Sequence, residues 1–174
     1  MNLDTHDVHL ILSGANRTGK LFAAGGIPIF DFETRNRTVR DGQLEHWGNC
    51  PPGEFILGKP IPMNTPPFGP WFLGIYDYGS HHAMFEHHRS GIGLHGGGSG
   101  LPHPLAPVQS PPWVPTHGCW RMVNEDLGHL VTIVKAVQDA GGRCFVTVTP
   151  WVPGSVEETD DWLDVEESAL DEDE

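Results

Sequence analysis

Short runs of apolar residues, broken by polar residues and turn formers, recur along most of this chain. Runs of this length are typical of β-strands, whereas a helical bundle needs longer stretches with a period near 3.6. The pattern predicts strands at residues 8–12, 20–24, 27–32 and 37–39. Glycine and asparagine lie between the first two runs, so we expect the chain to open with a β-hairpin.

The middle of the chain continues the pattern with more proline. A Pro-Gly turn precedes an apolar strand at residues 55–57, and an aromatic strand is expected at residues 71–78. Residues 60–70 are rich in proline, which donates no backbone hydrogen bond, so we expect an irregular loop there. A short buried strand at residues 92–95 should be followed by a long proline-rich loop from residue 96 to residue 115.

One segment has the period of a helix. Asn124 is expected to cap its N-terminus, with acidic residues in the first turn, and Gly141-Gly142 should end it before a strand at residues 144–148. The apolar face of this helix comprises Leu127, Leu130, Val131, Val134 and Val137. The predicted fold class is therefore mainly β with one principal α-helix.

Composition supports one compact domain. A chain of 174 residues can bury a sizeable core, and its 22 glycines and 16 prolines argue against a helical bundle. No run of 18 apolar residues occurs, so we expect no membrane span.

The net charge of −13 is concentrated at one end of the chain. Eleven of the 23 acidic residues follow Trp151, which leaves twelve against the ten lysines and arginines before it. We therefore expect a domain at residues 1–152 and an acidic, disordered tail at residues 153–174. Because no basic patch is evident, we expect no nucleic-acid partner.

The cysteine count and the N-terminal residues bear on the compartment in which the protein acts. Three cysteines form no disulfide framework, so at least one thiol should stay free. Residues 1–7 lack the basic start and apolar stretch of a signal peptide. The sequence therefore leaves the export route open.

Two segments carry the chemistry. The first is Ile92-Gly93-Leu94-His95-Gly96, and the second is Thr116-His117-Gly118-Cys119-Trp120-Arg121-Met122. A thiol is a poor nucleophile until a neighbouring imidazole removes its proton. Glycines beside such a pair let backbone N–H groups approach a substrate and stabilise an oxyanion.

Together these segments resemble the L,D-transpeptidase (YkuD-like) catalytic domain, although the stretch between them is longer than is usual there. The resemblance implies a β-sandwich in which Cys119 is the nucleophile and His95, oriented by the Gly96 carbonyl, is the general base. His117 would be a further catalytic residue that shapes the cleft rather than exchanging the proton. The backbone at Gly118 and Gly96 would form the oxyanion site, with the N–H groups of Gly118 and Cys119 as the donors. The expected substrate-binding residues are Thr116, Trp120 and Arg121. Arg121 could instead form a structural ion pair.

The same resemblance implies the activity. The enzyme would transfer acyl groups on peptidoglycan stem peptides, forming cross-links as an L,D-transpeptidase, or acting as an L,D-carboxypeptidase with water as acceptor. It would need no cofactor or metal, act as a monomer at the bacterial cell wall or periplasm, and be acylated by carbapenems.

Other functions fit parts of the sequence. A phage product or secreted antibacterial enzyme could use the same Cys/His site against peptidoglycan. The histidines between His81 and His88 could serve a zinc-dependent hydrolase, although no HExxH spacing occurs. A non-catalytic wall-binding module is the third alternative, in which Cys119 would be dispensable.

Overall fold

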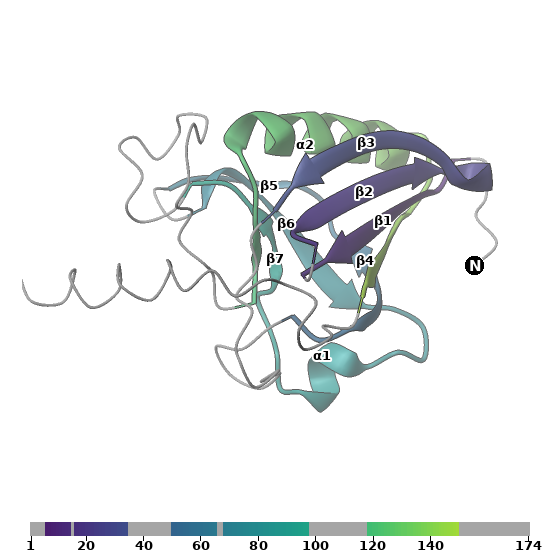
Figure 1. Cartoon of the computed structure of the whole chain (residues 1–174), viewed down its shortest axis with the longest axis vertical. Helices are drawn as coiled ribbons and strands as arrows, with labels where there is room; N and C mark the ends of the chain where they lie inside the picture. Colours follow the sequence, from purple (N-terminus) through teal and green to yellow (C-terminus); the bar gives the residue numbers. More distant parts are fainter. Residues whose placement is uncertain (1–5, 15, 35–49, 66–67, 98–117, 150–174) are drawn as a thin grey trace, which may run out of the picture.

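The computed structural model describes residues 6–14, 16–34, 50–65, 68–97 and 118–149 (Figure 1). Within these residues nine strands form a mixed sheet in the order β3-β2-β1-β9-β4-β6-β7-β8, with β5 added alongside β6. The strands are β1 (Val8–Ser13), β2 (Thr18–Ala23), β3 (Ile27–Glu33), β4 (Gly53–Leu57), β5 (Ile61–Thr65), β6 (Gly69–Asp77), β7 (Gly93–His95), β8 (Trp120–Arg121) and β9 (Cys144–Val148). The helical elements are the 3-10 turn η1 (Ala24–Gly26), α1 (Ala83–Glu86) and α2 (Asn124–Asp139). The prediction of a mainly-β fold with one principal helix is confirmed.

The N-terminal hairpin is present as expected. β1 pairs antiparallel with β2 from Val8 opposite Ala23 to Ser13 opposite Thr18, and β2 pairs with β3. On its other side β1 pairs in parallel with β9, the strand that follows α2. The expected strand at 37–39 and the acidic tail at 153–174 lie outside the described residues.

The prediction of an irregular loop at residues 60–70 is wrong. This segment contains β5 and the start of β6. β5 pairs only with β6, and the register shifts between Pro62 and Thr65. Proline is tolerated in a strand at a sheet edge or beside a bulge, where its missing N–H leaves no ladder partner unsatisfied.

β6 joins the two parts of the sheet. Its last residues pair with β4, from Ile75 opposite Leu57 to Asp77 opposite Phe55. Its earlier residues pair with β5 on one side and with β7 on the other. This long strand therefore connects the large N-terminal part of the sheet to β7 and β8.

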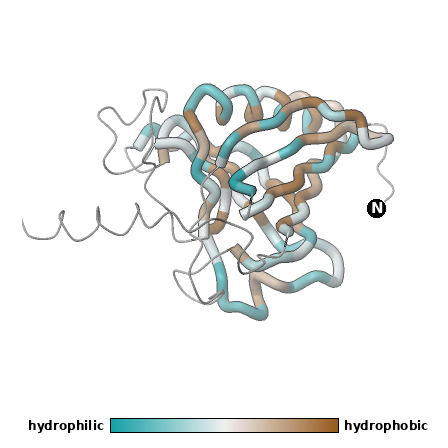
Figure 2. The backbone as a smooth tube through the Cα atoms, viewed as in Figure 1, coloured by the Kyte–Doolittle hydropathy of each residue, from teal (hydrophilic) through white to brown (hydrophobic). Residues whose placement is uncertain are grey.

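The helix α2 covers the sheet along the top of Figure 1 and contacts β6, β7 and β9. Figure 2 shows hydrophilic and hydrophobic residues alternating along it, as expected for an amphipathic helix. Its buried apolar residues are Leu127, Leu130, Val131 and Val134. They belong to one hydrophobic cluster with residues of most strands, including Leu10, Leu73 and Val146.

The predicted C-terminal signal of α2 and the acidic residues of its first turn are confirmed. The helix ends at Asp139, and Gly141 follows with φ +83°, a left-handed conformation that favours glycine. The prediction of Asn124 as N-cap is wrong, because Val123 occupies that position and makes no side-chain cap bond. The Asn124 side chain instead contacts the loop after β7.

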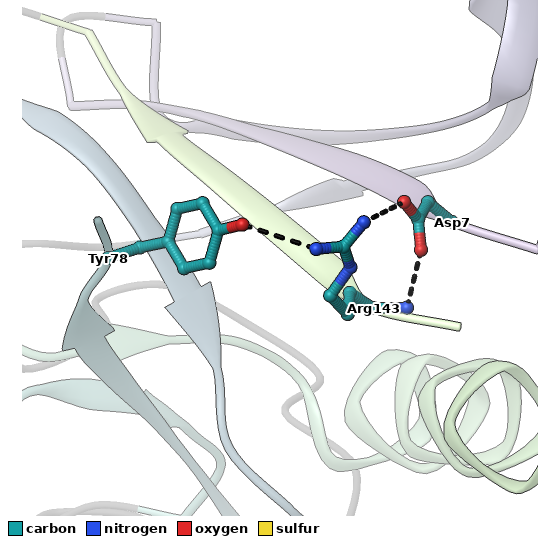
Figure 3. A network of polar contacts seen from close by, with 3 residues as sticks. All are labelled: Asp7, Tyr78 and Arg143. Atoms are coloured by element: carbon teal, nitrogen blue, oxygen red, sulfur yellow. Dashed lines mark hydrogen bonds and ion pairs between the residues drawn. The ribbon is translucent and has the colours of Figure 1, made fainter. Parts of the chain in front are cut away.

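A polar network joins the start of β1 to the start of β9 (Figure 3). Arg143 donates from its backbone N–H to Oδ1 of Asp7 at 2.8 Å and from Nη2 to Oδ2 at 3.1 Å. Its Nη1 donates to the Tyr78 hydroxyl at 3.2 Å. Asp7 is only 2% exposed, so these bonds satisfy a buried carboxylate.

None of the helices in the described part of the chain has the length and hydrophobicity needed to cross a membrane.

Candidate active site

His95 ends β7, the strand between β6 and β8. It pairs with Phe72 of β6 and with Arg121 of β8. The side chain is 3% exposed, and its ring meets Phe68 edge to face with ring centroids 5.0 Å apart. Neighbours on both strands and the aromatic ring therefore confine the imidazole to one small space.

The Gly96 carbonyl accepts a hydrogen bond from Nδ1 of His95 at 2.7 Å. A carbonyl can only accept, so Nδ1 carries the proton of the neutral ring and Nε2 keeps its lone pair. The pKa of His95 is lowered to about 4, mainly by burial; the bond to Gly96 opposes this change, and the Arg121 charge adds to it. His95 is thus neutral at pH 7 and able to accept a proton at Nε2.

Cys119 lies directly before β8 and follows Gly118, whose φ of +100° is the positive range that favours glycine. The thiol is partly buried and donates to the Gly91 carbonyl, with Sγ and O 3.5 Å apart. Burial raises the pKa of Cys119, whereas the Gly93 backbone and the charges of Arg89 and Arg121 lower it. The net shift is upward, so the thiol form dominates at neutral pH.

The parallel pairing of β7 with β8 puts His95 and Cys119 on neighbouring segments of the sheet. His95 is opposite Arg121, and Cys119 precedes Arg121 by two residues. The charge of Arg121 lowers the pKa of both side chains. The site therefore contains a thiol, a neutral imidazole and a cation on two adjacent segments of the sheet.

Arg121 itself is 6% exposed. Burial lowers its pKa to about 10, and the charge of Cys119 opposes that change. The guanidinium thus stays charged at neutral pH beside the nucleophile, and little of it reaches solvent.

Three hydrogen bonds hold the turn after His95. The His95 carbonyl accepts from the Met122 N–H at 2.9 Å, and the Gly96 N–H donates to the Phe68 carbonyl at 3.0 Å. The Gly97 N–H donates to Oδ1 of Asn124, also at 3.0 Å. The turn that carries the carbonyl partner of His95 is therefore fixed by the residue after β8, by α2 and by the residue before β6.

Sequence reasoning missed Arg89 and Asn124. Arg89 lies between α1 and β7, and its charge lowers the pKa values of both Cys119 and Cys50. Its place six residues before His95 was the available signal, but an arginine in a loop is too common to identify. The contact of Asn124 spans 27 residues and left no local pattern.

Two of the expected site residues, Thr116 and His117, lie outside the described part of the chain. Trp120 is 1% exposed and belongs to the hydrophobic cluster. This position does not fit the expected substrate contact, because a substrate arriving from solvent does not reach a core indole.

The remaining thiols are buried, and the histidine segment is largely exposed. Cys50 and Cys144 are buried, and burial raises the pKa of each to about 12. His81, His82 and His88 are exposed around α1, and His81 approaches Glu54 with Nε2 and Oε2 3.5 Å apart. Within the described ranges no three His, Cys, Asp or Glu side chains are grouped to hold a metal ion.

No model of a protein family matches the chain, and a search of curated protein sequences finds no match. Solved structures are similar in fold. The helical cell shape determining protein Pgp2 from Campylobacter jejuni matches with a TM-score of 0.59 and 17% identity, over 84% of this chain and 49% of that one. Bd1075 from Bdellovibrio bacteriovorus matches with a TM-score of 0.56 and 14% identity, over 97% of this chain and 56% of that one.

A third similar structure is an L,D-transpeptidase (Yku) from Stackebrandtia nassauensis. It matches with a TM-score of 0.51 and 16% identity, over 85% of this chain and 58% of that one. This chain thus spans roughly half the length of the solved structures it matches. With its mixed sheet and single main helix, the chain has the L,D-transpeptidase (YkuD-like) fold.

Proposed function

We propose that this protein catalyses cysteine-dependent acyl transfer on peptidoglycan stem peptides. The observation that carries the proposal is the parallel pairing of β7, which ends at His95, with β8, which directly follows Cys119. Nδ1 of His95 is bound to the Gly96 carbonyl at 2.7 Å. The fold is shared with an L,D-transpeptidase and with a cell shape determining protein, which supports a substrate in the cell wall.

The reaction would begin with transfer of the Cys119 proton to Nε2 of His95. The sulfur attacks the carbonyl of the third, diamino-acid residue of the stem peptide, and the bond to the terminal D-alanine breaks. The departing amine takes the proton from His95, which leaves a thioester on Cys119. An amine of a second stem peptide, or water, then attacks the thioester and releases the product, with His95 accepting the new proton.

The charges around Cys119 favour this step. Arg89 and Arg121 lower the pKa of the thiol against the effect of burial, so they stabilise the thiolate as it forms. The N–H groups of Gly118 and Cys119 are the proposed oxyanion donors, and Gly118 has the positive φ that such a turn requires. His117 and Thr116 would complete the cleft from the preceding loop.

An amine acceptor would make the enzyme an L,D-transpeptidase, and water would make it an L,D-carboxypeptidase. Both reactions act on peptidoglycan, so the proposed place of action is the bacterial cell wall or periplasm. Neither needs a cofactor in this mechanism.

The test is intact mass after incubation with a carbapenem. The native chain should gain one covalent adduct, and Cys119→Ala should gain none. Cys50→Ala is the matched control and should keep the adduct, because burial raises the pKa of the Cys50 thiol to about 12.

Incubation with a stem tetrapeptide would then identify the acceptor. A dimer mass indicates an amine acceptor, and a tripeptide indicates water. A folded native protein that gains no adduct and leaves the tetrapeptide intact would contradict the proposal and favour a non-catalytic wall-binding module.

A further inference from the structure

The peptide group between Gly96 and Gly97 is held from both sides. Its carbonyl accepts from Nδ1 of His95 at 2.7 Å. Its N–H, on Gly97, donates to Oδ1 of Asn124 at 3.0 Å, in a buried contact. Because a peptide group is planar and rigid, these two bonds link the imidazole to the Asn124 amide through a single unit.

Asn124 is fitted closely into this position. The side chain is 8% exposed. A Cβ atom at Gly96 would collide with Oδ1 of Asn124, and one at Gly69 would come within 2.6 Å of the same oxygen. Only glycine at these two positions leaves room for the amide, and α2 supplies a rigid base for it.

The usual role of asparagine at a helix start does not account for this contact. Val123 is the N-cap of α2, and no side-chain cap bond is formed there. The Asn124 oxygen is instead directed at a backbone N–H 27 residues earlier in the chain. The contact therefore serves the turn after β7 rather than the helix.

Linked hydrogen bonds polarise one another. An acceptor on the N–H side of a peptide group strengthens its carbonyl as an acceptor, by roughly 10–30% per bond in condensed-phase estimates. A stronger and immobile carbonyl at Gly96 holds the proton on Nδ1 of His95. It also holds the ring at the angle that leaves Nε2 available to the thiol.

We propose that Asn124 is a positioning residue that fixes the orientation and the Nδ1–H tautomer of His95 through the Gly96–Gly97 peptide group. The inference rests on the proposed role of His95 as general base. The arrangement resembles the part that a third residue plays in orienting a catalytic histidine, except that a backbone peptide group lies between the two side chains.

The charged and titratable groups near the imidazole determine how the pKa of His95 responds to a substitution at position 124. Among the described residues, Arg121 on β8 is the charged group that lowers the pKa of His95, and Cys119 is the titratable group beside Arg121. Phe68, directly before β6, presents its ring to the imidazole, and the uncharged Phe72 of β6 is the strand partner of His95. A new negative charge at position 124 would favour the protonated form of His95.

The experiment combines two readouts on Asn124→Ala and Asn124→Asp. Nitrogen NMR of the imidazoles gives the tautomer and the pKa of His95, and intact mass gives the pH profile of carbapenem acylation at Cys119. Asn124→Ala should populate both tautomers and slow acylation about tenfold, the scale of one net hydrogen bond. Asn124→Asp should keep the Nδ1–H tautomer and, through its charge, raise the pKa of His95 and move the acidic limb of the profile to higher pH.

Val134→Ala is the matched control, because it removes buried volume from the same helix away from the turn. It should lower the melting temperature without changing the tautomer or the pH profile. If Asn124→Ala does not fold, Asn124→Asp decides alone, since it keeps the shape of the side chain.

Unchanged tautomer and pKa of His95 in the folded Asn124 variants would overturn the inference. The NMR readout does not depend on activity. A native protein that is never acylated would contradict the proposed function. The tautomer of His95 in the Asn124 variants would still support or overturn the role of Asn124.

Discussion

The hydroxyl of Thr34 donates to the backbone carbonyl of Arg121 at 2.9 Å. Thr34 directly follows β3, and Arg121 lies in β8, so this buried bond joins the first and last strands in the order of the sheet. The sheet must therefore curve until its two ends meet, and the strand carrying Arg121 is supported from both sides. The closure of the fold and the position of the proposed site depend on the same bond.

Replacing Thr34 by Val should test this support. The change keeps the shape of the side chain but leaves a buried carbonyl without this donor, which should cost about 1–3 kcal/mol of unfolding free energy. Urea denaturation measures the loss, and slower carbapenem acylation should accompany it. Thr132→Val is the control, because its hydroxyl bonds only to Gly128 on an exposed face of α2. Equal losses in the two variants would show that the bond to Arg121 has no special role.

Arg89 should control the reactivity of Cys119. Its positive charge lowers the pKa of the thiol, so Arg89→Gln should raise that pKa and shift the pH profile of iodoacetamide alkylation to higher pH. Alkylation at pH 7 should slow several-fold, as followed by intact mass. Lys20→Gln, an exposed change on β2, removes the same charge far from the site and should leave the profile unchanged. A profile for Arg89→Gln that overlies the native one would contradict the assigned role.

Local patterns predicted the elements with strong local signals. Apolar runs located β1, β6 and β9, and helical spacing located α2. β5 was missed because Pro62 and the prolines around the strand suggest a loop, and Pro62 is tolerated beside the register shift in this strand. α1 has four residues, too few for a period to appear.

For the candidate site too, the sequence predicted the residues that belong to a local motif and missed those that depend on distant contacts. The motif identified Cys119 and His95, and the hydrogen bond expected between His95 and the Gly96 carbonyl is present. The place of Trp120 in the core, the charge supplied by Arg89 and the contact of Asn124 depend on packing between distant segments. No local pattern in the sequence specifies such contacts.

The network of Asp7, Arg143 and Tyr78 should matter for stability alone. Asp7→Ala removes two hydrogen bonds at a buried position between β1 and β9, and should lower the unfolding free energy by about 1–3 kcal/mol. Because these strands lie away from β7 and β8 in the sheet order, Cys119 should keep its rate of acylation in the folded variant. Asp31→Ala, exposed on β3, is the control and should be near neutral. A large loss of acylation in folded Asp7→Ala would show coupling that the structure does not predict.

The depressed pKa of His95 should make stability depend on pH. Its pKa is lowered from 6.5 to about 4, so between these values the unfolded chain binds a proton that the folded protein excludes. The stability that comes from a neutral His95 is therefore complete above pH 6.5 and decreases as pH falls towards 4, by about 3 kcal/mol in all.

Urea denaturation at several pH values between 7 and 4 should show a steeper fall for the native protein than for His95→Gln, which has no group to titrate at this position. His82→Gln, an exposed change beside α1, should follow the native slope. Parallel curves for the native protein and His95→Gln would mean that His95 titrates alike in the folded and unfolded chains. In that case the ring would not be the buried, neutral base that the proposed mechanism requires.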